Sequence, residues 1–347
     1  MKKSKKIKVG ISVGDLNGIG IEIILKTFAD NRMLDFCTPV LFASSKVVSF
    51  HKKALNLEIP VNGITSINKI IEHKFNLFNI WKDEVEINFG EPSKEIGKYA
   101  YLSLKEAVSA LNKGDIDVLV TAPINKHNIQ SEDFKFQGHT EYLEANIEGE
   151  SLMILMTDDL RIGLITGHIP IDKIAKTITP KLIKSKVKIM YDTLVQDFKI
   201  NKPKIAILGL NPHCGDNGVI GNEDNDIIKP TIEKIQESGK LVFGPYAADS
   251  FFGSEAYKKF DGVLAMYHDQ GLAPFKTLAF GKGVNFTAGL AKVRTSPDHG
   301  TAYEIAGKGQ ANESSFKEAL FKAIAIFNNR SEYQDLTKDV LKIKKKR

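Results

Sequence analysis

Short apolar runs alternate along the chain with stretches whose apolar side chains recur at helical spacing. Runs of strand length occupy residues 6–13, 39–43, 117–121, 151–156, 161–166, 205–210, 241–243 and 261–266. Helical periodicity is found at residues 21–29, 44–55, 97–113, 140–148, 171–177, 181–199, 226–238 and 314–329. Strands that alternate with helices in this way predict an α/β fold with a largely parallel sheet.

Three segments fall outside this alternation. Residues 56–95 are mixed in composition and are predicted to be irregular, and residues 244–252, which include Asp249, are predicted to form a loop. Ser44 is expected to cap the helix that follows it. Residues 266–312 are too rich in glycine for long helices and too apolar for disorder. The histidine, lysine, arginine and aspartate residues in this last segment predict a functional site.

The length of 347 residues suggests two domains, at about 150 residues per domain. No apolar run approaches the roughly 18 residues of a membrane span. The N-terminus is basic and then apolar, but the apolar part is short and leads into a turn, so it predicts a first strand rather than a signal peptide. Cys37 and Cys214 are far apart and predict no disulfide framework, which fits a reducing cytoplasm.

The formal net charge of +6 comes from the two ends of the chain. Residues 1–8 contain five lysines and residues 342–347 contain four lysines and one arginine, with no acidic residue in either segment. Without these ten charges the remainder has a net charge of −4. Because the remainder has no basic stripe, we expect neither nucleic-acid nor membrane binding.

The first predicted strand ends in a glycine-rich loop, residues 14–20, which reads GDLNGIG. Such glycines let backbone amides approach an anion at the N-terminus of the next helix. They are also typical of a tight turn that binds no ligand. The spacing differs from G-x-G-x-x-G, so no Rossmann motif is predicted.

Three histidines share one local pattern. His168, His213 and His268 each come just after an apolar strand, and the carboxyl ends of parallel strands can converge at one edge of a sheet. Three neutral imidazoles with open coordination positions suit a catalytic divalent metal ion, and Asp269 could orient one of them. The alternative is that each histidine only caps its own loop.

Lys276, Asn285 and Arg294 recur at intervals of nine residues. A lysine point charge, an amide and a planar guanidinium suit a phosphate or a carboxylate; the alternative is three solvated surface groups. His139 and Thr140 open a predicted helix. Either Thr140 is only the cap of that helix, or His139 beside it offers an imidazole to an anion.

Eight motifs occur in order between about residue 7 and about residue 330. They read GDLNGIGIE, GHTEYL, GHIPI, NPHCGDNG, AADSFF, YHDQGLAPFK, VNFTAGL and VRTSPDHGTAYEIAGKG. Together they resemble the 4-hydroxythreonine-4-phosphate dehydrogenases of vitamin B6 biosynthesis. The last motif is also similar to the HGSAPDIAGKG-type loop of isocitrate and isopropylmalate dehydrogenases. Leu16, Asn17 and Ile21 depart from the family's GDPAGIGPE loop, and its NPHAGE motif reads NPHCGD here.

The resemblance implies the two-domain α/β/α fold of isocitrate and isopropylmalate dehydrogenases, with a cleft between the domains and no Rossmann motif. One domain would comprise residues 1–126 and 300–347. The second, residues 127–299, would carry the metal and substrate residues and the dimer contacts. A homodimer with its active site at the subunit interface is therefore expected.

The resemblance also assigns roles to individual residues. His168, His213 and His268 match the ligands of a divalent metal ion such as zinc, magnesium or cobalt, through which they would act in catalysis. Asp249 is expected near this site as a further catalytic residue. The residues that match substrate-binding positions are His139, Thr140, Lys276, Asn285 and Arg294. Those expected to face NAD or NADP, by analogy with the isocitrate dehydrogenase loop, are His299, Gly300, Thr301, Ala302 and Asn312.

The implied reaction is oxidation of 4-phosphooxy-L-threonine to a 3-keto acid, which then loses CO2 to give 3-amino-2-oxopropyl phosphate. A paralogous dehydrogenase of threonate or erythronate 4-phosphate is an alternative, because the same metal, phosphate and cofactor sites would serve it. Further alternatives are a phosphate-handling acyltransferase, which needs no histidine metal site, and a non-catalytic protein that binds a phosphorylated metabolite.

Overall fold

The computed structural model describes residues 6–279 and 281–339, so most of the lysine-rich ends lies outside the described residues. Its strands are β1 (Lys8–Ser12), β2 (Thr38–Ala43), β3 (Asn62–Ile64), β4 (Asn76–Asn79), β5 (Val118–Thr121), β6 (Gly149–Met156), β7 (Arg161–Leu164), β8 (Lys204–Leu208), β9 (Leu241–Tyr246), β10 (Gly262–Ala265), β11 (Val284–Leu290) and β12 (Val293–Pro297). In the described part of the chain they form one 12-stranded sheet in the order β3-β4-β2-β1-β5-β12-β11-β6-β7-β10-β8-β9.

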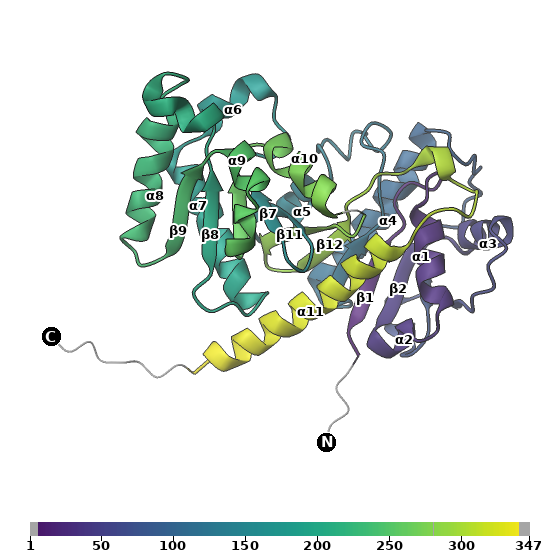
Figure 1. The fold of residues 1–347 in the computed structure, drawn as a ribbon. Helices are drawn as coiled ribbons and strands as arrows, with labels where there is room; N and C mark the ends of the chain where they lie inside the picture. The colour runs from purple at the N-terminus through teal and green to yellow at the C-terminus, as the bar shows by residue number, and fades with distance from the viewer. Residues whose placement is uncertain (1–5, 280, 340–347) are drawn as a thin grey trace.

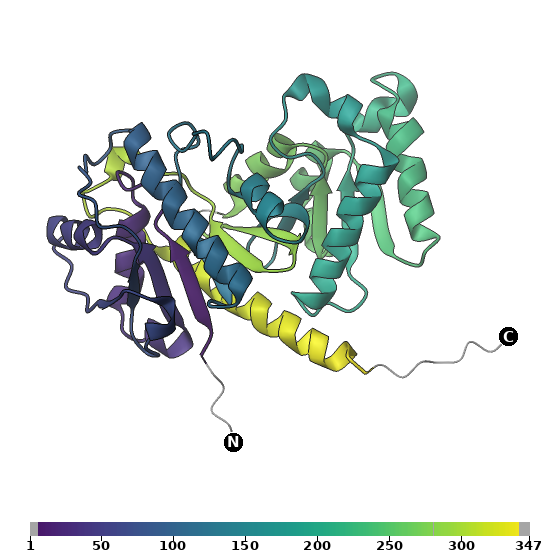
Figure 2. The ribbon, with the colours of Figure 1, turned by 180° about the vertical axis from the view of Figure 1, so that it is seen from behind.

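The helices connect these strands and cover both faces of the sheet. The α-helices are α1 (Gly20–Ala29), α2 (Met33–Phe36), α3 (Ser45–Ala54), α4 (Lys94–Lys113), α5 (His139–Asn146), α6 (Ile171–Thr177), α7 (Pro180–Gln196), α8 (Lys229–Gln236), α9 (Ala248–Gly253), α10 (His268–Ala279) and α11 (Ser314–Thr337). Helices α1 and α11 lie in front in Figure 1, and α4 covers the opposite face (Figure 2). The predicted α/β class is confirmed.

Parallel pairing dominates the sheet, as the alternation of strands and helices predicts. The exceptions among the described pairings lie at the centre, where β11 runs antiparallel to both β12 and β6, and β6 runs antiparallel to β7. Strand β12 is parallel to β5, so it joins the N-terminal half of the sheet to the central strands. Segments that are distant in sequence therefore meet at the middle of the sheet.

The long helix α11 packs across this central junction. Its buried residues include Phe316, Ala319, Leu320 and Ala323, and the carbonyl of Ala319 accepts a hydrogen bond of 2.7 Å from the Thr295 hydroxyl on β12. Figure 1 shows α11 running from the N-terminal part of the molecule toward the other end. None of the helices in the described part of the chain combines the length and apolarity that a membrane span needs.

Residues 268–279 correct the prediction that this segment has no long helix. They form α10, although Gly271 and Pro274 lie within it. A Cβ atom added to Gly271 would lie 2.9 Å from Cβ of Ala265 and from Cγ2 of Ile162. The glycine therefore lets the helix approach the sheet closely, and it does not break the helix.

Three smaller predictions are also wrong. Residues 56–95 contribute β3 and β4 to the edge of the sheet. Residues 248–253 form the short helix α9 rather than a loop. Ser44 occupies the N-cap position of α3 but makes no capping hydrogen bond, and its hydroxyl is buried without a partner in the described structure.

Candidate active site

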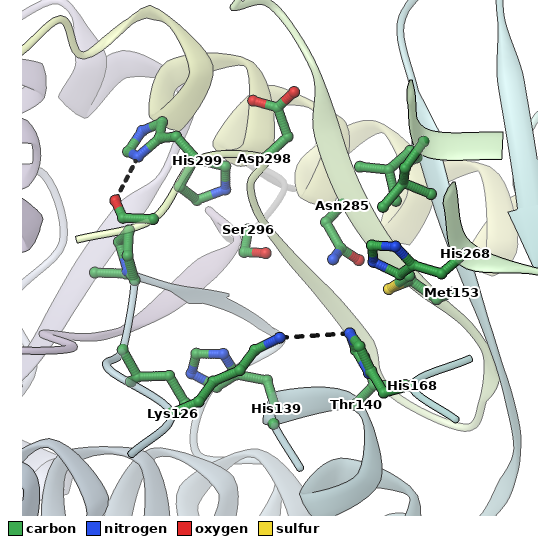
Figure 3. Close-up of a pocket in the computed structure, with 18 of the residues that line it drawn as sticks. Lys126, His139, Thr140, Met153, His168, His268, Asn285, Ser296, Asp298 and His299 are labelled. Carbon is green, nitrogen blue, oxygen red and sulfur yellow. Dashed lines mark hydrogen bonds between the residues drawn. The ribbon is translucent and has the colours of Figure 1, made fainter. Parts of the chain in front are cut away.

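A cavity of about 240 Å³ opens beside the central strands β11 and β12. Figure 3 shows side chains from several elements pointing toward this common space. The sequence-predicted residues that line it are His139, Thr140, His168, His268, Lys276, Asn285, Arg294, His299 and Gly300. The structure thus brings all five predicted substrate-binding residues together with two of the three predicted metal ligands.

Arg294 is a buried cation without an acidic partner. Arg294 is 2% exposed. Among the described groups, its guanidinium donates hydrogen bonds only to the hydroxyls of Thr121 (3.1 and 2.5 Å) and Thr287 (3.2 Å). Burial lowers the pKa of Arg294 to about 9, and the charge of Glu141 opposes this shift. A buried, unpaired guanidinium is costly, so this position favours binding of an anion.

Two polar atoms of the predicted substrate-binding residues have no partner in the described structure. These are Nε2 of His139 and Oδ1 of Asn285. Burial, followed by the charges of Arg294 and Lys126, lowers the pKa of His139 well below its usual value, so the ring is neutral at pH 7. Buried polar atoms are nearly always hydrogen-bonded, so these two atoms are available to a ligand.

Thr140 lines the cavity and does not cap α5. The N-cap position of this helix is Gly138, and no side-chain capping hydrogen bond is present there. Helix α5 nevertheless begins at the cavity, and it places His139, Thr140 and Glu141 in its first turn. The capping alternative for Thr140 is therefore wrong.

His168 is held by a carboxylate on one side of its ring. Nδ1 donates to Oε1 of Glu141 at 3.0 Å, and Nε2 lies 3.4 Å from Nζ of Lys126. Burial raises the pKa of Glu141, but the hydrogen bond from His168 and nearby positive charges lower it by more. The ionised carboxylate fixes the ring with the lone pair of Nε2 turned toward the cavity.

His268 has the same arrangement at the start of α10. Its Nδ1 donates to Oδ1 of Asp269 at 2.7 Å, which is the contact that the sequence suggested. The centroids of the His168 and His268 rings are 5.3 Å apart. Carboxylates that orient two neighbouring imidazoles are typical of histidines that bind metal.

His213 does not join these two rings within the described chain. It is exposed and lines a neighbouring cavity of about 320 Å³ together with Asp249, Tyr267 and Gln270. No group of three histidine, cysteine, aspartate or glutamate residues in residues 6–279 and 281–339 is arranged to hold a metal ion. The metal role of His213 and the role of Asp249 remain predictions.

The segment predicted to face the cofactor begins at the wall of the cavity. Nδ1 of His299 donates to the Gly300 carbonyl at 3.0 Å, and its Nε2 is buried without a partner in the described structure. Thr301 and Ala302 follow in the chain and are not among the residues that line the cavity. Asn312 is exposed, and its Oδ1 accepts a hydrogen bond of 2.8 Å from the Ser314 amide at the start of α11.

Comparison with known proteins decides the family. The model of the family described as "Pyridoxal phosphate biosynthetic protein PdxA" matches residues 35–323. The chain belongs to the PdxA family. The resemblance that the eight sequence motifs carry is therefore confirmed.

PdxA relatives match nearly the whole chain. The 4-hydroxythreonine-4-phosphate dehydrogenase of Bacteroides thetaiotaomicron is 51% identical over 330 residues, which cover 94% of this chain and 91% of that protein. The protein of the same name from Sulfurihydrogenibium is 42% identical and covers 92% of this chain and 98% of its own length. The crystal structure of a 4-hydroxythreonine-4-phosphate dehydrogenase from Burkholderia phymatum has a TM-score of 0.74 at 34% identity, covering 93% of this chain and 99% of that one.

Three residues of this PdxA site were not selected from the sequence. Lys126 follows β5 and lines the cavity, Glu141 orients His168, and Asp298 is the one carboxylate that lines the cavity among the described residues. Burial raises the pKa of Asp298, opposed by Lys276 and His299. The position of Lys126 just after a strand end was an available signal, whereas the roles of Glu141 and Asp298 depend on tertiary contacts.

Proposed function

We propose that this chain is an NAD(P)- and divalent-metal-dependent 4-hydroxythreonine-4-phosphate dehydrogenase. It would oxidise 4-phosphooxy-L-threonine to a 3-keto acid that decarboxylates to 3-amino-2-oxopropyl phosphate. The observation that carries the proposal is the buried Arg294, which forms no ion pair with the described residues and shares one cavity with Lys276 and Lys126. The relatives' names supply the reaction.

The positive groups of the cavity have the task of binding the substrate's phosphate and carboxylate groups. A guanidinium presents paired donors to such a group, and a lysine adds a point charge. The unpartnered atoms of His139 and Asn285 provide additional hydrogen-bonding positions. Because the phosphate takes no part in the reaction, the binding energy of its contacts orients the reacting carbon.

His168 and His268 are the residues in this chain that fit a divalent metal ion. Each has Nδ1 bound to a carboxylate, which leaves Nε2 as the coordinating atom. A bound divalent cation would lower the pKa of a substrate hydroxyl and polarise a neighbouring carbonyl. Lys126, whose ammonium lies 3.4 Å from Nε2 of His168, would turn away from the ring and toward the substrate.

His299 and Gly300 fit a dinucleotide at the other side of the cavity. The buried and unpartnered Nε2 of His299 is a donor or acceptor without a protein partner in the described structure. Together with Thr301 and Ala302 this residue forms a segment that would hold the cofactor beside the bound substrate. The cofactor carries out the hydride chemistry, and the protein positions it.

A second copy of the chain supplies the third metal ligand in this proposal. His213 is exposed and lies outside the cavity that contains His168 and His268, so a homodimer with the site at its interface would complete the set.

The two cysteines, Cys37 and Cys214, are free, which supports a reducing cytoplasmic location.

The first test is formation of NADH, followed by its absorbance, with 4-phosphooxy-L-threonine as substrate. We expect turnover that is lost on addition of a chelator and restored by zinc, magnesium or cobalt. Turnover that prefers threonate or erythronate 4-phosphate would favour the paralogous dehydrogenase instead. Binding of the phosphorylated substrate without NADH formation would contradict the proposed activity, and acyl transfer that is insensitive to chelation would indicate an acyltransferase.

The second test mixes two inactive variants. His213→Ala and His268→Ala subunits should together recover about a quarter of the wild-type activity, because half of randomly paired dimers are mixed and each mixed dimer has one intact site. The matched control mixes His168→Ala with His268→Ala, which lie on the same subunit and should recover no activity. No recovery in the first mixture would rule out a metal site shared between two subunits.

A further inference from the structure

The glycine-rich loop 14–20 packs against the segment that follows His299. The amide of Ile19 donates a 3.0 Å hydrogen bond to the carbonyl of Thr301. A Cβ atom added to Gly18 would lie 2.8 Å from that carbonyl oxygen, so glycine is required for the close approach. Residues 14–20 thus form a platform for residues 299–302. We name these the platform and the 299–302 loop.

A partly buried hydrogen bond joins the platform to Tyr303, which directly follows this loop. The hydroxyl of Tyr303 donates to Oδ2 of Asp15 at 2.7 Å, and Asp15 is 1% exposed. The other carboxylate oxygen, Oδ1, accepts from the Asn17 amide at 3.0 Å. Nδ2 of Asn128, from the segment after β5, lies 3.5 Å from the Tyr303 hydroxyl. Three separate segments therefore meet at one tyrosine hydroxyl.

Ala302, between the hydrogen-bonded Thr301 carbonyl and Tyr303, has an unfavourable backbone conformation. Ala302 has φ 45° and ψ 55°, in the left-handed region. A residue with a Cβ atom in this region costs about 1–2 kcal/mol, and such strain persists only where the surroundings impose it. The Thr301 carbonyl and the Tyr303 hydroxyl are held on either side of Ala302, so these two contacts impose the conformation.

We propose that Asp15 and Tyr303 are positioning residues that hold the 299–302 loop in the conformation that binds the dinucleotide. This inference rests on the proposed function, which assigns the loop to the cofactor. Burial raises the pKa of Asp15, and the hydrogen bond from Tyr303 opposes the rise. The same hydroxyl that fixes the loop therefore also stabilises a buried carboxylate.

The side chains of the pair contact the 299–302 loop and not the substrate cavity. Neither Asp15 nor Tyr303 lines the cavity that contains Arg294 and Lys276. Removing the Tyr303 hydroxyl should consequently weaken dinucleotide binding and leave the contacts to the phosphorylated substrate in place. A residue that merely stabilised the fold would not separate these two affinities.

The test is calorimetric titration of NAD or NADP into wild-type protein and into Tyr303→Phe. We expect the Kd for the dinucleotide to rise about tenfold, as for loss of a hydrogen bond to a charged group, with a matching rise in its KM. The KM for 4-phosphooxy-L-threonine should stay unchanged. In hydrogen–deuterium exchange, the amides of residues 301–303 should exchange faster in the variant.

Two further variants make the outcome specific. Tyr257→Phe removes the hydroxyl of a different tyrosine, in the segment Ala256–Lys259, and should leave the dinucleotide Kd unchanged. Asp15→Asn keeps an acceptor for Tyr303 and should bind more tightly than Asp15→Ala. An unchanged Kd in Tyr303→Phe, while the wild type binds, would overturn this inference alone. A wild-type protein that binds no dinucleotide would overturn the proposed function as well.

Discussion

The buried Arg294 and the partly buried Arg330 differ in what neutralises their charge. Arg330 on α11 donates to both carboxylate oxygens of Asp197 at 2.8 Å and to the Leu290 carbonyl at 3.0 Å. Arg294 on β12 reaches only two threonine hydroxyls among the described groups. Arg330 is neutralised by a carboxylate of the chain, whereas Arg294 has no carboxylate in contact with it among the described residues.

The difference separates a structural role from a binding role. A buried ion pair stabilises the native arrangement chiefly because either partner alone would be costly. A buried cation with no counter-ion reduces stability in the free protein and favours any ligand that brings a negative charge. The contrast between Arg330 and Arg294 can therefore be tested by measuring stability and ligand affinity separately.

The largest expected effect is on folding stability in Arg330→Ala. This change leaves the Asp197 carboxylate buried and unpaired, so the free energy of unfolding should fall by about 3–5 kcal/mol, measured by urea denaturation. The matched control is Lys199→Ala, which removes an exposed ion pair with Glu332 on the same helix and should cost less than about 1 kcal/mol. Equal effects of the two changes would contradict a structural role for the buried pair.

The next effect should appear in the kinetics of Arg294→Ala. Loss of a buried charge contact to the substrate should lower kcat/KM by about 100-fold, or about 3 kcal/mol, mainly through a higher KM for the phosphorylated substrate. The unfolding free energy should not fall as it does in Arg330→Ala. Arg294→Lys keeps the charge and should recover part of the affinity. An unchanged KM would remove Arg294 from the phosphate site.

A smaller effect is expected when the carboxylate beside His168 is neutralised. Glu141→Gln should lower zinc affinity about tenfold, because the hydrogen bond that orients the imidazole is weakened; calorimetric titration of zinc measures this. Glu144→Gln is the control on the same helix, where the carboxylate instead accepts hydrogen bonds from Ser151. Equal zinc affinity in wild type and Glu141→Gln would show that this carboxylate does not support a metal ligand.

The smallest effect concerns pH and the neutral His139. Its pKa is lowered in the folded protein, so the unfolded chain binds a proton below pH 6.5 that the folded chain does not. Stability should therefore fall as the pH falls, with a contribution of up to about 1.4 kcal/mol per pH unit. The urea midpoint of His139→Gln should change less between pH 7 and pH 5 than that of the wild type. The same substitution at the exposed His73 should not have this effect.

His51 contributes to the same pH dependence, since burial lowers its pKa to about 4. The comparison between wild type and His139→Gln isolates the contribution of His139 because His51 is present in both. An identical slope in the two proteins would show that His139 takes up its proton in the folded state. Such a result would contradict the expectation that Arg294 and Lys126 disfavour a positive charge on His139.

Local pattern was sufficient for many of the strands and helices, but it did not locate β11 and β12 at the centre of the sheet. The apolar runs located β1, β5, β8 and β10 to within a few residues, because each is short and mostly apolar. Strand β4 was missed because it begins with the polar Asn76. This side chain is buried and bonds to Asn62 and to the backbone of Ile71, Lys74 and Pro39. Only the tertiary structure shows that such an amide is satisfied.

Some residues of the site could likewise be predicted from the sequence, whereas others could be found only in the structure. His139, Lys276, Asn285 and Arg294 were selected by residue type and by resemblance, and the structure brings them to one cavity. Gly271 misled the prediction for α10, since a glycine that permits close packing and a glycine that ends a helix look alike in sequence. The hydroxyl of Tyr303 was missed because its partner, Asp15, lies 288 positions away in the chain.

The position of β12 in the sheet also constrains how the chain is made. This strand lies between β5 and β11 and is covered by α11, yet it is among the last segments to leave the ribosome. The N-terminal strands must therefore wait, with one edge and one apolar face open, until synthesis is nearly finished. Contacts between such distant segments slow folding, so a nascent chain that stalls before residue 293 would present a ready surface for chaperones or for self-association.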